Sequence, residues 1–181
     1  MPTTVKKPQA AAAAIDALNK AIHSEQMALA TYLKFARQTK VVSGKDMFIR
    51  LSEDELGHRE ILEKELGNLQ AGKPWCKPTF KPSDIEELLP KLTDAQAKAQ
   101  AEHGSSDDLS ALNIALDMEK KAMAFYRREA DKSADATARK MYARLAEMEE
   151  AHYNLIQAEI DNIKDMGFWF GIQEFTLESN E

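Results

Sequence analysis

The chain contains an internal repeat, in which a pair of apolar-patterned segments recurs 94 positions later. The first copy spans residues 15–37 and 47–66, and the second spans residues 109–129 and 141–160. Apolar residues recur every three or four positions in all four segments, which is the spacing of a buried helix face. The repeat therefore predicts two copies of a helix pair.

Six polar residues lie on these predicted buried faces, at positions where leucine would be expected. They are Glu25, Glu55, His58, Glu119, Glu149 and His152. The same 94-residue offset relates them as three pairs, so each copy carries a glutamate on its first helix and Glu-x-x-His on its second. An ionised carboxylate without a partner is very costly to bury. Four carboxylates around one point demand a strong positive charge, which two divalent or trivalent metal ions would supply.

The connections between these segments set the expected topology of a single domain. We expect helices over residues 9–39, 45–69, 108–132 and 136–166, a crossover over 70–107 and a tail over 167–181. Gly44 is interpreted as a left-handed stop between the first two helices, whose short connection makes them antiparallel neighbours. A helix of about 25 residues is about 37 Å long. The crossover is long enough to travel that length, so the second and third helices should run parallel.

Shorter features complete this expectation. Within the crossover, Ser83 and Thr93 are interpreted as the starts of short helices over residues 83–87 and 93–103. The aromatic cluster at residues 168–170 is expected to plug one end of the bundle, and a dimer contact is the alternative because exposed aromatic residues tend to find partners.

Composition excludes several classes of protein. The net charge of −6 and the pI near 5.4 argue against a nucleic-acid partner. Cys76 is the only cysteine, which excludes a disulfide framework within the chain and a CxxC metal knuckle. No apolar run approaches the length of a membrane span, and Asp16 and Lys20 interrupt the N-terminal alanine run, so we read it as the start of a helix rather than a signal peptide. We expect a soluble, cytoplasmic protein.

The six residues resemble the ligand set of the ferritin-like di-iron carboxylate proteins, and the chain as a whole is similar to the helical domain of rubrerythrins. The resemblance implies an all-α, ferritin-like four-helix bundle with a long crossover and a short C-terminal aromatic tail. It also implies two iron ions, with manganese or a mixed metal pair as an alternative. Glu25 and Glu119 would each hold one metal, Glu55 and Glu149 would bridge both, and each histidine would bind one.

Other titratable residues have less defined roles. Tyr32 and Tyr126 are also 94 positions apart and share helix faces with Glu25 and Glu119, so either they hydrogen-bond a ligand carboxylate or a bound peroxide, or they are ordinary core residues. Several acidic residues flank the ligands and are expected to be solvated, with one of them as a possible extra ligand: Glu53, Asp54, Glu147 and Glu150. His23 and His103 lack a glutamate three positions before them and are expected to face solvent.

Two departures from the rubrerythrin pattern affect the expected function. Rubrerythrins usually carry a rubredoxin-like domain with paired CxxC motifs, whereas this chain has only Cys76. We therefore expect electrons from a separate donor such as rubredoxin. Leu116 stands where rubrerythrins tend to carry an extra glutamate one turn before the third-helix ligand, which leaves open the iron movement and peroxide reduction associated with that residue.

The resemblance implies a di-iron oxidoreductase that reduces hydrogen peroxide or dioxygen, and we expect a homodimer. One alternative is a ferroxidase or other iron-handling protein, which would form a large hollow assembly or hold many irons per chain. A second is a metal-free helical interaction module. The hypothesis of a metal-free module predicts that Glu25→Ala or Glu149→Ala leaves the stability of the fold unchanged or improves it.

Overall fold

The computed structural model describes residues 7–81, 83, 85–86, 104–166 and 169. Within them the chain forms four long helices and no strand: α1 (Lys7–Gln38), α2 (Val42–Gln70), α4 (Ser106–Lys132) and α5 (Ala136–Met166). The all-α bundle predicted from the repeat is confirmed, and each helix begins and ends within three residues of its predicted bounds. None of these helices combines the length and the apolar character needed to cross a membrane.

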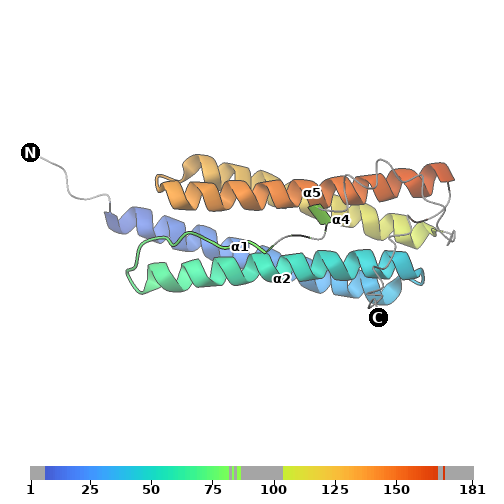
Figure 1. Cartoon of the computed structure of the whole chain (residues 1–181), viewed down its shortest axis with the longest axis horizontal. Helices are drawn as coiled ribbons and strands as arrows, with labels where there is room; N and C mark the ends of the chain where they lie inside the picture. Colours follow the sequence, from blue (N-terminus) through green and yellow to red (C-terminus); the bar gives the residue numbers. More distant parts are fainter. Residues whose placement is uncertain (1–6, 82, 84, 87–103, 167–168, 170–181) are drawn as a thin grey trace, which may run out of the picture.

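The helices pack as two antiparallel pairs, α1 with α2 and α4 with α5, and the pairs lie side by side (Figure 1). Following the colours from blue to red in Figure 1 shows that α2 and α4 run in the same direction. The chain must therefore return along the bundle between them, as the length of the crossover predicts.

The hydrophobic core divides into two clusters along the bundle axis. One contains Tyr32, Phe35, Phe48, Leu51, Leu112, Leu155, Ile156 and Ile160, and the other contains Leu18, Ile22, Leu62, Tyr126, Met141, Tyr142 and Leu145. Both clusters draw on all four helices. On each helix, the predicted glutamate falls between the residues of the two clusters. The apolar clusters therefore close both ends of the central polar site.

The connection between α1 and α2 differs from the prediction. The sequence predicts a left-handed stop at Gly44, and this prediction is wrong because Gly44 lies inside α2. Among the described glycines, the positive φ belongs to Gly72, at 69°, just after α2. Gly44 is required for space instead, since a Cβ there would lie 2.8 Å from Thr39 Cγ2 and 2.9 Å from the ring of Trp169.

Part of the crossover is described, and it lies against the bundle. The Ser83 hydroxyl accepts hydrogen bonds from the backbone N–H groups of Ile85, at 3.2 Å, and Glu86, at 3.4 Å. This is the N-cap contact predicted for Ser83. Ile85 is fully buried, which anchors the segment to the core. The second short helix, predicted over residues 93–103, lies outside the described residues.

Trp169 is the one described residue of the aromatic tail. It is 3% exposed, and its ring meets the ring of Phe48 in a T-shaped contact at 6.1 Å. The side chain therefore closes the end of the bundle near the α1–α2 connection. This is the plugging role predicted for the cluster, whose other members lie outside the described residues.

Candidate metal centre

The six predicted ligands meet midway along the bundle. The structure buries all of them to 2% exposure or less: Glu25, Glu55, His58, Glu119, Glu149 and His152. They come from the middle of four different helices, with Glu25 on α1, Glu119 on α4 and one Glu-x-x-His on each of α2 and α5. His23 is exposed, as predicted, and His103 lies outside the described residues.

These side chains form two overlapping groups, each compact enough to surround one metal ion. Position 1 consists of Glu25, Glu55, His58 and Glu149, and position 2 consists of Glu55, Glu119, Glu149 and His152. Within each group, one potential ligand atom per residue lies within 4.8 Å of the others. Glu55 and Glu149 belong to both groups, which is the placement that two bridging carboxylates require.

The histidines point their Nδ1 atoms at the two shared glutamates. His58 Nδ1 lies 3.0 Å from Glu55 Oε2 and 3.1 Å from Glu149 Oε1. His152 Nδ1 lies 3.3 Å from Glu55 Oε1 and 3.6 Å from Glu149 Oε2. The two imidazole rings are nearly parallel, with an angle of 17° and centroids 5.6 Å apart. The imidazoles and the shared carboxylates thus line one central space.

The unpaired polar atoms of this space fit a pair of metal ions. Glu55 Oε1, Glu149 Oε1 and His152 Nδ1 are buried and form no hydrogen bond among the described residues, although each faces an oppositely charged group at 3.1–3.3 Å. Buried polar atoms are rarely left unpaired, because each costs about 1–3 kcal/mol. Carboxylate oxygens and imidazole nitrogens are the donors that iron and manganese accept in proteins. The residues present therefore match the group that the fold implies.

Two tyrosines fix the glutamates that belong to single positions. The Tyr32 hydroxyl donates to Glu119 Oε1, and the Tyr126 hydroxyl donates to Glu25 Oε1. Each tyrosine therefore reaches the glutamate of the other repeat copy rather than the one on its own helix. Burial, followed by the charges of the nearby glutamates, raises the pKa of both phenols well above the ordinary value. Both hydroxyls thus keep their protons and remain donors.

The metal-free site carries protons on the two single-position glutamates. Burial raises the pKa of Glu25 and of Glu119 well above the ordinary value, and the charges of Glu55 and Glu149 raise it further. For the two shared glutamates, burial also favours the protonated form, but contacts with the imidazoles outweigh it and lower their pKa. The shared pair is therefore ionised while the outer pair is neutral.

The histidines balance this charge. Burial would lower the pKa of His58, but Glu149 and Glu55 outweigh it and raise the pKa to about 10. The pKa of His152 is also raised well above the ordinary value, because Asp54 and three glutamates outweigh its burial. The metal-free centre thus pairs two imidazolium ions with the carboxylates of Glu55 and Glu149, and Asp54 adds a third carboxylate beside His152. A metal ion that bound to these residues would have to displace the imidazole protons.

Asp54 has a role that the sequence does not specify. Its Oδ2 atom lies 3.0 Å from His152 Nε2 and accepts a 2.5 Å hydrogen bond from the Ser83 hydroxyl. These contacts outweigh partial burial and lower the pKa of Asp54. The other acidic residues that flank the ligands are exposed: Glu53, Glu147 and Glu150. The sequence shows only that Asp54 precedes Glu55. Which of the four flanking carboxylates reaches a histidine depends on how the helices are rotated about their axes.

A further pair of buried glutamates was missed by the sequence analysis. Glu65 and Glu159 are each 1% exposed, and they obey the 94-residue offset. Glu65 Oε2 accepts a 3.0 Å hydrogen bond from the backbone N–H of Cys76, which fixes the first part of the crossover against α2. Their position seven residues after each histidine is a signal that the repeat contains.

Comparison with known proteins assigns the family. The profile of the rubrerythrin family matches residues 16–160, which is well over half of the chain and includes all six residues of the centre. The chain belongs to the rubrerythrin family. A search of the curated proteins finds no match. In this rubrerythrin-family chain, the buried carboxylate and histidine cluster is compatible with a di-iron site. Leu116, the departure noted in the sequence, is partly buried against the hydrophobic core.

Proposed function

We propose that this protein is a di-iron oxidoreductase that reduces hydrogen peroxide or dioxygen with electrons from a separate donor such as rubredoxin. The observation that carries the proposal is the pair of overlapping donor groups that share Glu55 and Glu149 inside a rubrerythrin-family bundle. Reduction of one hydrogen peroxide to two waters consumes two electrons and two protons. Two ferrous ions held together, when bound, supply the two electrons at one place.

The chain's own residues prepare the site for this chemistry. Glu25 and Glu119 would each hold one metal ion, and the tyrosine bonded to each fixes one carboxylate oxygen in place. The two core clusters flank the centre along the bundle, and this apolar surrounding strengthens the electrostatic interactions of its buried side chains. The site therefore combines fixed ligands with retained phenol protons at Tyr32 and Tyr126.

The test is anaerobic loading with ferrous iron, followed by an iron count and absorption spectra before and after peroxide. We expect about two irons per chain, as di-iron ferritin-like proteins hold, and oxidation that consumes one peroxide per ferrous pair and is faster than oxidation by dioxygen. Oxidation by dioxygen alone would favour an oxidase or a ferroxidase over a peroxidase. Many irons per chain, or a hollow assembly, would favour iron handling. No bound metal would leave only a metal-free interaction module.

The ligand assignment has its own test. His58→Ala and Glu55→Ala are each expected to abolish binding of at least one metal ion, because each removes a donor from a buried centre. His23→Ala is the matched control, since His23 is exposed on α1 and should leave the iron count unchanged. If both ligand variants keep the full iron content and full peroxide activity, the assignment is wrong.

A further inference from the structure

The repeat makes the two halves of the centre directly comparable, and they differ at the position that precedes each shared glutamate. Asp54 precedes Glu55 on α2, and the residue 94 positions later is Met148, which precedes Glu149 on α5. Because the two repeat copies face each other across the bundle, Asp54 and Met148 should each lie near the histidine of the other copy. The structure shows this placement, because Asp54 contacts His152 while Met148 lines a cavity together with His58.

His152 is held by a chain of polar contacts. Its Nε2 atom lies 3.0 Å from Asp54 Oδ2, and the Ser83 hydroxyl donates to the same oxygen at 2.5 Å. Ser83 is fixed in turn because it caps the segment that begins at Ile85. A carboxylate that accepts the proton of one imidazole nitrogen fixes the ring orientation and the tautomer, and it makes the other nitrogen a stronger metal ligand.

His58 has no such support. Its Nε2 atom is buried and has no hydrogen-bond partner among the described residues. The adjoining cavity has a volume of about 360 Å³. Charged residues also line it, none of them bonded to that nitrogen: Arg50, Glu53, Asp54, Glu60 and Lys81. The thioether of Met148 is only a weak hydrogen-bond acceptor. Nothing in the described residues therefore fixes the His58 ring as Asp54 fixes the His152 ring.

We propose that the two metal positions are unequal and that Asp54 is a positioning residue that makes position 2 the tighter of the two. The inference rests on the proposed metal pair and adds the order in which the two positions are filled. The first metal ion bound should occupy position 2, with Glu119 and His152. Loss of such a partner of a ligand histidine weakens metal affinity by roughly 10- to 100-fold. The effect of Asp54 is therefore large enough to separate two binding steps.

Titration of the metal-free protein with cobalt(II) tests this order. The d–d absorption bands report each binding step, and a competing chelator gives its affinity. Wild type should bind two cobalt ions in two separated steps. Asp54→Asn should weaken the tighter step by roughly 10-fold or more and leave the other within a few-fold. Glu53→Gln is the matched control, because Glu53 is the exposed neighbour of Asp54 and should change neither step.

Two further variants separate positioning from a structural role. Met148→Asp gives His58 the partner that His152 has and should tighten the weaker step. Because Met148 is 4% exposed, that variant can fail to fold. Ser83→Ala leaves all six ligands and Asp54 in place, and it should weaken the tighter step by a smaller factor than Asp54→Asn does. If Asp54 and Ser83 had only a structural role, these variants would change the free energy of unfolding without changing the ratio of the two cobalt affinities.

The outcomes distinguish this inference from the proposed function. No cobalt bound by folded wild type, with none bound in iron loading, would overturn both. Two steps of equal affinity, or an Asp54→Asn variant that weakens both steps alike, would overturn the inequality and leave the metal centre standing. A weakened tighter step in both Asp54→Asn and Ser83→Ala would support it.

Discussion

At the residue scale, the polar side chains of the interior find their partners across the bundle. Tyr126 on α4 donates to Glu25 on α1, and Tyr32 on α1 donates to Glu119 on α4. Each bond therefore joins the two repeat copies, and each leaves the second oxygen of its glutamate for the central space. The tyrosines stabilise the docking of the two helix pairs as well as the geometry of the site.

This arrangement predicts the cost of removing one hydroxyl. Tyr126→Phe should lower the free energy of unfolding of the metal-free protein by about 1–3 kcal/mol, because it leaves a buried oxygen of Glu25 without its donor. Urea denaturation measures the change. Tyr142→Phe is the matched control, since Tyr142 is 2% exposed, stacks on Tyr126 and has a hydroxyl without a partner among the described residues. Equal costs in the two variants would show that the bond to Glu25 contributes nothing.

The sequence predicts which residues enter the interior far better than which atoms they contact. Glu55 and His58 were predicted to be buried because helical periodicity determines the face on which a residue lies, and the structure buries both. The contact of Asp54 with His152 was not predicted. It depends on a rotation of α2 that periodicity leaves uncertain by part of a turn, and on Ser83, which lies far away in the chain.

At the scale of a helix, Gly44 shows that one residue type serves two structural purposes. Glycine ends helices because it tolerates positive φ, and it also allows close packing because it has no Cβ. The sequence around Gly44 does not distinguish these uses, and the structure assigns the first to Gly72 and the second to Gly44. The neighbours that decide the matter are Thr39 and Trp169, and the latter lies far away in the chain.

Alanine substitutions at two glycines of α2 should therefore have opposite effects. Gly44→Ala should lower the free energy of unfolding by about 1–3 kcal/mol, because its Cβ would overpack against Thr39 and Trp169. Gly67→Ala should raise it by up to about 1 kcal/mol, because alanine favours a helix and no atom lies within 4 Å of the new Cβ. Thermal unfolding of both variants is the measurement, and a stabilised Gly44→Ala would contradict the packing shown here.

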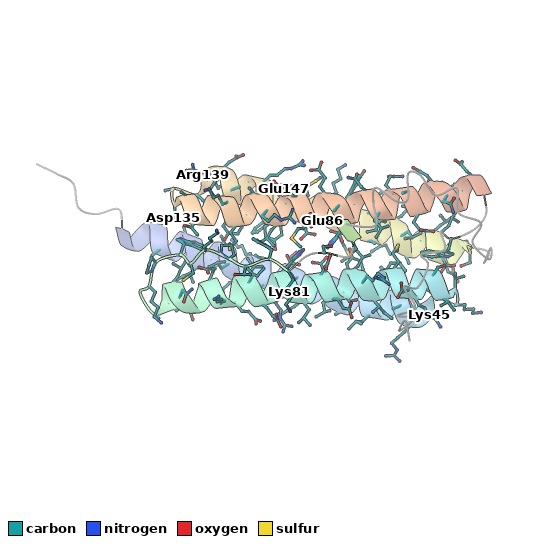
Figure 2. All side chains as sticks on the ribbon, viewed as in Figure 1. Lys45, Lys81, Glu86, Asp135, Arg139 and Glu147 are labelled. Carbon is teal, nitrogen blue, oxygen red and sulfur yellow. The ribbon has the colours of Figure 1, made fainter. Side chains whose placement is uncertain are left out.

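At the scale of the whole molecule, the crossover segment contacts both helix pairs. Ser83 bonds Asp54 on α2, and Glu86 forms a 2.6 Å ion pair with Arg144 on α5. Figure 2 shows Glu86 near the middle of the bundle, between the two pairs and close to Glu147. The return path that the repeat requires therefore also ties the two halves together beside the centre.

Apolar burial, rather than the ion pair, should hold this segment. Ile85→Ala should cost about 2–5 kcal/mol, because Ile85 is fully buried in the core. Glu86→Ala should cost under about 1 kcal/mol, because Glu86 and Arg144 are 28% and 34% exposed and solvent weakens their attraction. Urea denaturation of the two neighbouring variants compares them directly. A larger loss from Glu86→Ala would mean that the ion pair dominates.

The charge balance of the centre predicts how the stability of the whole metal-free protein depends on pH. The pKa of His58 is about 10 in the fold, compared with 6.5 for an ordinary histidine. The folded protein therefore binds this proton more tightly than the unfolded chain does, and the stability gained is complete below pH 6.5. As the pH rises from 6.5 towards 10, the unfolded chain loses its proton first and that contribution disappears.

We therefore expect the free energy of unfolding of the metal-free protein to fall steadily across this interval. The metal-loaded protein should not show the same fall, because metal binding has already removed the imidazole protons and higher pH favours the ligand forms. Urea denaturation of metal-free and cobalt-loaded protein at several pH values measures both curves. His58→Ala should flatten part of the metal-free curve. A level metal-free curve over this interval would mean that the fold does not protonate these histidines, and the pairing of two imidazolium ions with the surrounding carboxylates would be wrong.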